Sequence, residues 1–271
     1  MTHFSWKRTL VDGRPAQYGV IGAGRPVLFL HGWALAQHAY RDTLRPLADL
    51  GCRVFAPALP GFGGTRDLRG HHVDFAGFGA WTREFCATVG IDEPAIVIGH
   101  SFGGGVAIQL AADAPALVDS VVLLNSIGGR WDQSHLMAER PLWRWGLALP
   151  TDVLGFVGGK AKVVPSLLED AIPNLMRNPL AVYRVGTLAR HADLGPQLRE
   201  LRHRSIPVTV VHGDADAIVP RSSFDALCAV LGVSGTVVRG SHSWPLADAE
   251  GFTRLVRPLV TAPRLPRSSV A

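Results

Sequence analysis

A serine between two glycines gives this chain its clearest chemical signal. Ser101 is the centre of Gly99-His100-Ser101-Phe102-Gly103, which has the pattern Gly-x-Ser-x-Gly. The β-branched apolar run 95–98 before it is typical of a buried strand, and residues 104–112 after it favour a helix. A serine on the tight turn between a strand and a helix exposes its hydroxyl, and flanking glycines avoid a collision there. The pattern therefore predicts that Ser101 is a nucleophile.

A nucleophilic serine needs a general base, and histidine is the usual one. The chain has 11 histidines, so position must decide between them. Catalytic groups of an open parallel sheet lie at the carboxyl ends of its strands. His242 follows the predicted strand 235–239 and precedes the helical segment 246–260. We therefore expect His242 to accept the serine proton.

An acidic residue must in turn hold the histidine. Asp216 follows the predicted strand 208–212, so it belongs to the same edge of the sheet. Asp214 is the other candidate, although an aspartate at that place is typical of a turn. The order Ser101, Asp216, His242 along the chain is the order that accompanies this strand–turn–helix motif.

The negative charge that forms on the substrate oxygen needs hydrogen-bond donors. The backbone amide of Phe102, at the start of the predicted helix, is one expected donor. The amide of Trp33, just after the apolar strand 27–30, is the other. His31 in the same loop is expected to bond with the local backbone, with substrate contact as the alternative.

Apolar segments alternate with helical ones along most of the chain, which indicates an α/β fold with a mainly parallel twisted sheet and helices on both faces. The predicted strands are residues 4–10, 16–21, 27–30, 53–56, 95–98, 121–125, 208–212 and 235–239. The predicted helices include residues 40–50, 73–89, 104–112, 222–231 and 246–260.

One long segment interrupts this alternation. No strand is evident between residues 126 and 206, and an unstructured connection of that length would be unusual. We interpret it as a helical cap inserted after the sixth strand. The expected division is an α/β core of residues 1–126 and 206–262, a cap of residues 127–205 and a disordered tail of residues 263–271.

Composition narrows the possible partners. The chain of 271 residues is 47% hydrophobic and 18% charged, as expected of a globular protein, and its net charge of +5 is scattered. The short cluster 199–204 is typical of a solvated helix end, so no nucleic-acid partner is expected. Three distant cysteines indicate neither a disulfide framework nor a zinc site. Residues 1–8 do not resemble a signal peptide, and no apolar run reaches the ~18 residues of a membrane span.

From these absences we expect a cytoplasmic protein without an integral membrane span and without a bound metal. The oligomeric state and attachment to a membrane surface remain open.

On these motifs the chain resembles the α/β-hydrolase fold serine hydrolases, an esterase- and lipase-like group that includes members with a helical cap. The motifs that carry the resemblance appear in family order over about residues 27–259: His31-Gly32, residues 60–65, residues 99–104, Gly213-x-x-Asp216 and His242. The resemblance implies that Asp216, rather than Asp214, is the acid. Some members place the acid after the preceding strand, where this chain has Asn125 and Ser126.

The resemblance implies cleavage of a carboxylic ester or thioester through an acyl-enzyme, without a cofactor. The nucleophile is serine and not aspartate, which separates the chain from the epoxide hydrolases and haloalkane dehalogenases. The missing His-Gly-Gly-Gly separates it from the lipases that carry that motif. We expect a small-molecule substrate with an apolar group.

The residues expected to contact that substrate are His31, Trp131, Trp143 and Trp244. Three other functions stay open. The first is hydrolysis of a carbon–carbon bond in a vinylogous diketone, and the second is cofactor-free haloperoxidase or perhydrolase chemistry. The third is a ligand-binding protein without catalysis on the same scaffold.

Overall fold

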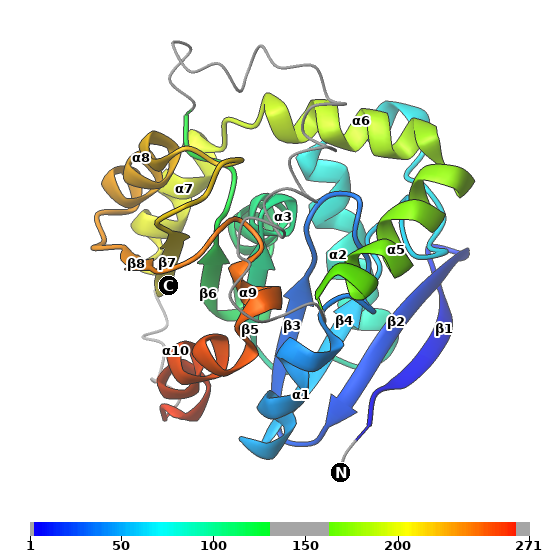
Figure 1. The fold of residues 1–271 in the computed structure, drawn as a ribbon, viewed down its shortest axis with the longest axis horizontal. Helices are drawn as coiled ribbons and strands as arrows, with labels where there is room; N and C mark the ends of the chain where they lie inside the picture. Colours follow the sequence, from blue (N-terminus) through cyan, green and yellow to red (C-terminus); the bar gives the residue numbers. More distant parts are fainter. Residues whose placement is uncertain (1–2, 131–162, 264–271) are drawn as a thin grey trace.

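The computed structural model describes residues 3–130 and 163–263, which form a sheet covered by helices (Figure 1). The sheet has eight strands in the order β1-β2-β4-β3-β5-β6-β7-β8. β2 is antiparallel to β1 and β4, and the pairs from β4 to β8 are parallel. The strands are β1 (Ser5–Val11), β2 (Arg14–Gly22), β3 (Arg25–Leu30), β4 (Cys52–Pro57), β5 (Ala95–His100), β6 (Val118–Leu124), β7 (Val208–Gly213) and β8 (Thr236–Val238).

These strands and their mainly parallel pairing confirm the predicted fold class. The continuous apolar runs arise because both faces of the sheet are covered. In β3, Val27 and Phe29 pack with helices α1 and α10 on one face. Leu28 and Leu30 point to the other face, which helices α2, α3, α7 and α8 cover.

The helices of the two faces are α1 (Arg41–Asp49), α2 (Phe75–Val89), α3 (Phe102–Asp113), α7 (Gly195–His203), α8 (Arg221–Leu231) and α10 (Ala249–Thr261). Shorter helical segments are η1 (Gly70–His72), η2 (Pro115–Leu117) and α9 (Trp244–Ala247). None of the helices within the described ranges is long and apolar enough to cross a membrane.

Helices α5 (Val163–Arg177), α6 (Pro179–Arg190) and α7 lie between β6 and β7 in the sequence. Figure 1 shows α6 across the upper side of the view, with α5 beside it. The third helix, α7, packs against α3 and α8 on one face of the sheet. Trp131 and Trp143, which we expected to contact the substrate, lie outside the described residues.

Polar bonds attach α5 and α6 to the loop that follows β3. The buried carboxylate of Asp170 accepts hydrogen bonds from the amides of Ala36 (3.0 Å) and Ala39 (2.9 Å). The indole Nε1 of Trp33 donates to the carbonyl oxygen of Val182 (2.8 Å). Because each bond satisfies a polar group that would otherwise be poorly solvated, the loop and the two helices hold one another in place.

Candidate active site

Ser101 lies on a sharp turn between β5 and α3, as the sequence predicts. Its backbone has φ 54° and ψ −116°, a conformation that costs a non-glycine residue energy. A Cβ atom on Gly103 would lie 2.1 Å from the carbonyl oxygen of Leu30, and one on Gly99 would lie 2.5 Å from that of Gly103. Only glycine therefore fits on either side of the serine, which confirms the geometric reason for the motif.

His242 and Asp216 form a buried pair. Nδ1 of His242 lies 2.9 Å from Oδ2 of Asp216. An ionised carboxylate can only accept, so Nδ1 carries the proton and Nε2 of the neutral ring is left as an acceptor. The other oxygen, Oδ1, accepts from the amides of Ile218 (2.8 Å) and Val219 (2.9 Å). The carboxylate is thus held on both sides in the orientation that faces His242.

These bonds determine the ionisation of Asp216. Burial by itself would raise the pKa of this carboxyl group, but the neighbouring His242 and the amides of Ile218 and Val219 lower the pKa by more. The pKa therefore lies below its ordinary value, and the group is a carboxylate at neutral pH. Asp214 makes a different contact: its Oδ1 accepts from the amide of Gly240 (2.8 Å), so it joins the loop after β7 to the loop after β8.

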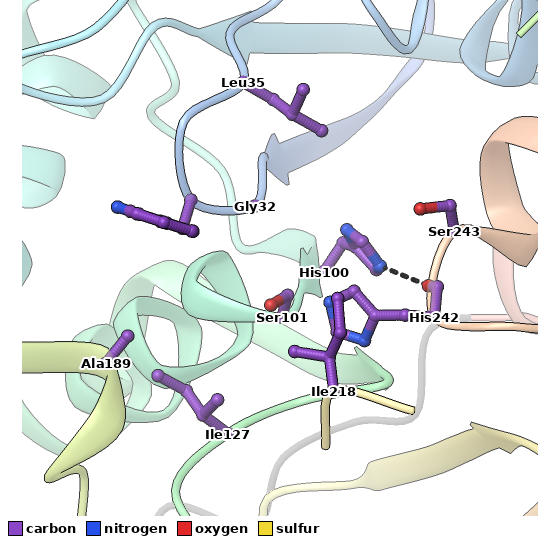
Figure 2. A pocket seen from close by; sticks show the side chains of 10 residues that line it. Gly32, Leu35, His100, Ser101, Ile127, Ala189, Ile218, His242 and Ser243 are labelled. Carbon is purple, nitrogen blue, oxygen red and sulfur yellow. Dashed lines mark hydrogen bonds between the residues drawn. The ribbon is translucent and has the colours of Figure 1, made fainter. Parts of the chain in front are cut away.

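Ser101 and His242 line the same pocket, which encloses about 480 Å³ including the part open to solvent. Figure 2 shows both side chains there, with Ile127, Ile218 and Ala189 around them. Among the described residues, the Ser101 hydroxyl has no hydrogen-bond partner. Hydrogen bonds between a nucleophile and its base are often long in a free enzyme and shorten when substrate binds. The lining residues are Gly32, Trp33, Leu35, His100, Ser101, Ile127, Ala189, Ile218, His242 and Ser243.

The two amides expected to hold a negative oxygen are near this serine. Phe102 is the first residue of α3, and an amide at that position has no acceptor within its own helix. Trp33 lines the pocket from the loop after β3, and its indole is anchored on α6. Trp33 and Phe102 therefore stay the residues that we expect to supply these donors.

His31 is buried behind the pocket and does not line it. Its Nε2 accepts from the amide of Leu59 (2.8 Å), and its Nδ1 donates to the carbonyl oxygen of Gly32 (2.9 Å). Burial lowers the pKa of His31 to about 4, so the ring is neutral at pH 7. These bonds agree with the expected backbone role and leave no ring nitrogen for a substrate.

Trp244 is also buried and lies outside the lining of the pocket. Its indole Nε1 donates to Oδ1 of Asn125 (2.7 Å), and Nδ2 of Asn125 donates to Asp216. The structure therefore places Trp244 behind the acid instead of beside a substrate. The sequence reasoning missed Asn125, although a polar residue at the end of an apolar strand was a usable signal.

Tyr40 and His100 form a second buried arrangement that the sequence did not indicate. The amide of Gly32 donates to the Tyr40 hydroxyl oxygen (3.3 Å), which lies 2.7 Å from Nδ1 of His100. Nε2 of His100 donates to the backbone carbonyl of His242 (2.9 Å), shown as the dashed line in Figure 2. Burial and the nearby His242 lower the pKa of His100 to about 3, so its ring is neutral and Tyr40 is the donor to Nδ1.

No group of three or more His, Cys, Asp or Glu side chains that could hold a metal ion occurs in residues 3–130 and 163–263.

Comparisons with known proteins agree with this geometry. The family model described as alpha/beta hydrolase fold matches residues 25–171. A protein of Mycobacterium phage D29 that carries the name non-heme haloperoxidase is 30% identical over 262 residues, which cover 89% of each chain. The pimeloyl-[acyl-carrier protein] methyl ester esterase of Neisseria meningitidis is 30% identical over 259 residues, covering 88% of this chain and 93% of that enzyme.

Solved structures show the same fold at lower identity. The esterase of Exiguobacterium antarcticum has a TM-score of 0.78 and 18% identity, covering 97% of this chain and 100% of that one. An esterase of Thermogutta terrifontis has a TM-score of 0.74 and 21% identity, covering 95% and 100%.

Proposed function

Because the chain belongs to the alpha/beta hydrolase fold family, we propose that it is a serine hydrolase that cleaves carboxylic esters or thioesters through an acyl-enzyme. One observation carries the proposal. The imidazole of His242 is bonded to the carboxylate of Asp216 and lines the same pocket as Ser101. These are the three groups that nucleophilic acyl transfer requires.

In the first half of the reaction, Ser101 Oγ attacks the carbonyl carbon of the substrate while Nε2 of His242 takes the hydroxyl proton. The carbonyl electron pair moves to oxygen, and the amides of Trp33 and Phe102 stabilise the resulting charge. When the tetrahedral intermediate collapses, the bond to the alcohol or thiol breaks. His242 gives its proton to that leaving group, and the acyl group stays on Ser101.

In the second half, His242 takes a proton from water, and the hydroxide oxygen attacks the acyl carbon. Collapse of the second intermediate returns the proton to Ser101 and releases the acid. Asp216 stays ionised throughout, since its low pKa favours the carboxylate. It keeps the ring in the correct tautomer and stabilises the imidazolium that forms in both halves.

The lining of the pocket indicates the class of substrate. Leu35, Ile127, Ala189 and Ile218 contribute apolar side chains, and none of the lining residues that the structure describes is lysine, arginine, aspartate or glutamate. Such a surface favours an uncharged apolar acyl or alcohol group. The names of the methyl ester esterases among the relatives support an ester as the bond that is cleaved.

We assign the described part of the cap to α5 and α6, and α6 reaches the pocket through Ala189. We place α7 with the core, because it packs against α3 and α8. This shortens the cap that we expected at residues 127–205.

Ser101→Ala tests the proposal directly. We expect it to abolish hydrolysis of p-nitrophenyl butanoate while the circular dichroism spectrum and Tm stay those of the wild type. A fluorophosphonate should label the wild type at Ser101 and leave the variant unlabelled. Ser243→Ala is the matched control, because Ser243 lines the same pocket and should not be needed for labelling. Retained turnover in Ser101→Ala would refute the proposal.

The relative named as a non-heme haloperoxidase supports a second candidate on the same residues. In perhydrolysis, hydrogen peroxide replaces water in attacking the acyl-enzyme and a peracid leaves. Peracid formation from an ester and hydrogen peroxide, compared with hydrolysis of the same ester, measures which of the two reactions dominates.

A further inference from the structure

A fully buried asparagine follows the last residue of β6. Asn125 has no exposed surface and has a φ of 44°, in the left-handed region. Asparagine tolerates this conformation better than most residues. The strand before it is apolar, so the amide is a polar group at the end of a hydrophobic element. A buried amide in such a place is stable only when its hydrogen bonds are satisfied.

The bonds of Asn125 are satisfied in one orientation only. Its Oδ1 accepts from Nε1 of Trp244 (2.7 Å) and from the amide of Gly213 (3.3 Å). Its Nδ2 donates to Oδ2 of Asp216 (2.5 Å) and to the carbonyl oxygen of Ser241 (3.5 Å). If the amide were flipped, its NH₂ group would face the N–H donors of Trp244 and Gly213. Its oxygen would then face the carboxylate of Asp216. The neighbours therefore fix the NH₂ group on Asp216.

The hydrogen bond from Asn125 reaches the same carboxylate oxygen of Asp216 that His242 contacts. Oδ2 of Asp216 accepts both from Nδ2 of Asn125 and from Nδ1 of His242, while Oδ1 is occupied by two backbone amides. Four donors from three segments of the chain thus fix the plane of the carboxylate. Without Asn125, one side of Oδ2 would lose its donor, and the carboxylate could rotate away from the imidazole.

We propose that Asn125 is a positioning residue that holds Oδ2 of Asp216 in line with Nδ1 of His242, and that Trp244 fixes the orientation of the Asn125 amide. This inference rests on the proposed function of Ser101, Asp216 and His242. It assigns to Asn125 a specific electrostatic property, because the group beside the acid must be a neutral donor.

Asn125→Leu tests this donor role, because it removes the hydrogen bond to Oδ2 of Asp216 with little change in volume and adds no charge. His242 faces Asp216 and His100, and His212 lies 4.0 Å from Oδ2 of Asp216. If the carboxylate turns away from the imidazole, the protonated ring loses part of its stabilisation and its pKa falls. We expect the acid limb of the profile of kcat/KM against pH to move down by about one pH unit, since activity needs the neutral ring. A merely structural loss would lower kcat/KM equally at all pH values.

Asn178→Leu is the matched control. Nδ2 of Asn178 also donates to an aspartate, Asp67, at 2.5 Å, but this pair lies outside the lining of the pocket. The control removes the same kind of donor, and its acid limb should coincide with that of the wild type. An Asn125→Leu profile that keeps the wild-type limb would overturn the inference.

Trp244→Phe supplies a second test that does not change charge. It keeps an aromatic ring and removes the donor to Oδ1 of Asn125, although the smaller ring also leaves some buried space unfilled. We expect kcat to fall about fivefold with KM unchanged. A wild-type kcat in Trp244→Phe would contradict the role of the indole, even if Asn125→Leu failed to fold.

A readout without turnover separates this inference from the proposed function. NMR titration of the His242 ring should show a midpoint about one pH unit lower in Asn125→Leu than in the wild type. If the wild type hydrolyses no ester and takes up no fluorophosphonate, the proposed function fails, yet this titration still tests the contact. An unchanged midpoint would reject the inference while leaving the proposed function intact.

Discussion

Nε2 of His100 donates a hydrogen bond to the backbone carbonyl of His242 at 2.9 Å, so the residue before the proposed nucleophile holds the backbone of the proposed base. Tyr40 extends this connection to the amide of Gly32, the neighbour of Trp33. The loop that offers an oxyanion donor and the loop that offers the base are thereby joined through the end of β5. Buried hydrogen bonds of this kind fix distances because a broken one leaves an unsatisfied polar group.

Tyr40→Phe should therefore reduce activity even though it preserves the aromatic packing. The ring contact with Phe29, at 4.5 Å between centroids, is kept, while Gly32 and His100 lose their shared partner. We expect kcat/KM for p-nitrophenyl butanoate to fall about 10-fold. Tyr183→Phe, on the exposed surface of α6, is the control and should behave as the wild type. An unchanged kcat/KM in Tyr40→Phe would show that the connection is dispensable.

Asp216→Asn should lower kcat more than any other substitution proposed here except Ser101→Ala. The amide cannot stabilise the imidazolium and permits the wrong tautomer of His242, so kcat should drop about 10⁴-fold, the loss that this change causes in a serine protease triad. Asp214→Asn is the comparison, since its oxygen can still accept from the amide of Gly240. Measured on the same ester, it should keep kcat within about threefold of the wild type. Equal losses in both variants would contradict the assignment of the acid.

Sequence patterns predicted the sheet well because burial on both faces leaves a strong signal. Helix boundaries were less accurate, and local capping explains why. The helical segment predicted at 246–260 is divided into α9 and α10 at Asp248, whose side chain accepts from the amide of Gly251. Likewise α2 begins at Phe75 because Asp74 caps it. Hydrophobic periodicity does not report such side-chain bonds.

Ser101, His242 and Asp216 could be predicted to lie near one another because each follows a strand that the sequence predicts. The residues that support these three could not be predicted in the same way. Tyr40 and His100 are 60 positions apart, and Trp244 lies 119 positions from Asn125, so no local pattern marks either contact. We expected Trp244 to touch the substrate because it lies close to His242 in the sequence. Gly240 has a φ of 153°, and the short turn that follows it directs the side chain of Trp244 inward to Asn125 instead.

Ala189→Phe should change which esters are hydrolysed. Ala189 lines the pocket from α6, so a larger side chain there fills the space beside Leu35 and Ile127. We expect kcat/KM for p-nitrophenyl octanoate to fall at least about 10-fold more than that for the acetate. Ala87→Phe, at an exposed position of α2, is the control for a bulky residue on a helix. A uniform change across the acyl-chain series would show that the acyl group binds elsewhere.

Gly103→Ala should destabilise the turn that carries Ser101. The added Cβ would lie 2.1 Å from the carbonyl oxygen of Leu30, so the start of α3 must move. Overpacking of this kind typically costs about 1–3 kcal/mol, which urea unfolding can measure. Gly70→Ala is the matched control, because a Cβ there meets nothing within 4 Å. If both variants unfold at the same urea concentration, the close packing of the turn is not a constraint.

Stability should fall in mildly acidic solution because His31 is buried as a neutral ring. Burial lowers its pKa to about 4 from 6.5, so between these values the unfolded chain binds a proton that the folded chain does not. The free energy of unfolding therefore decreases as the pH falls from about 7.5 to about 4, and levels off below that. At pH 5 this histidine alone should lower the free energy of unfolding by about 2 kcal/mol relative to pH 8.

Urea unfolding of the wild type and of His31→Asn at pH 8 and pH 5 measures this contribution. The variant lacks the titrating ring, so its loss of stability between the two pH values should be smaller than that of the wild type by about 2 kcal/mol. His203→Asn, at an exposed position of α7, is the control and should lose as much as the wild type. An equal loss in His31→Asn and the wild type would mean that the buried ring takes up its proton without cost to the fold.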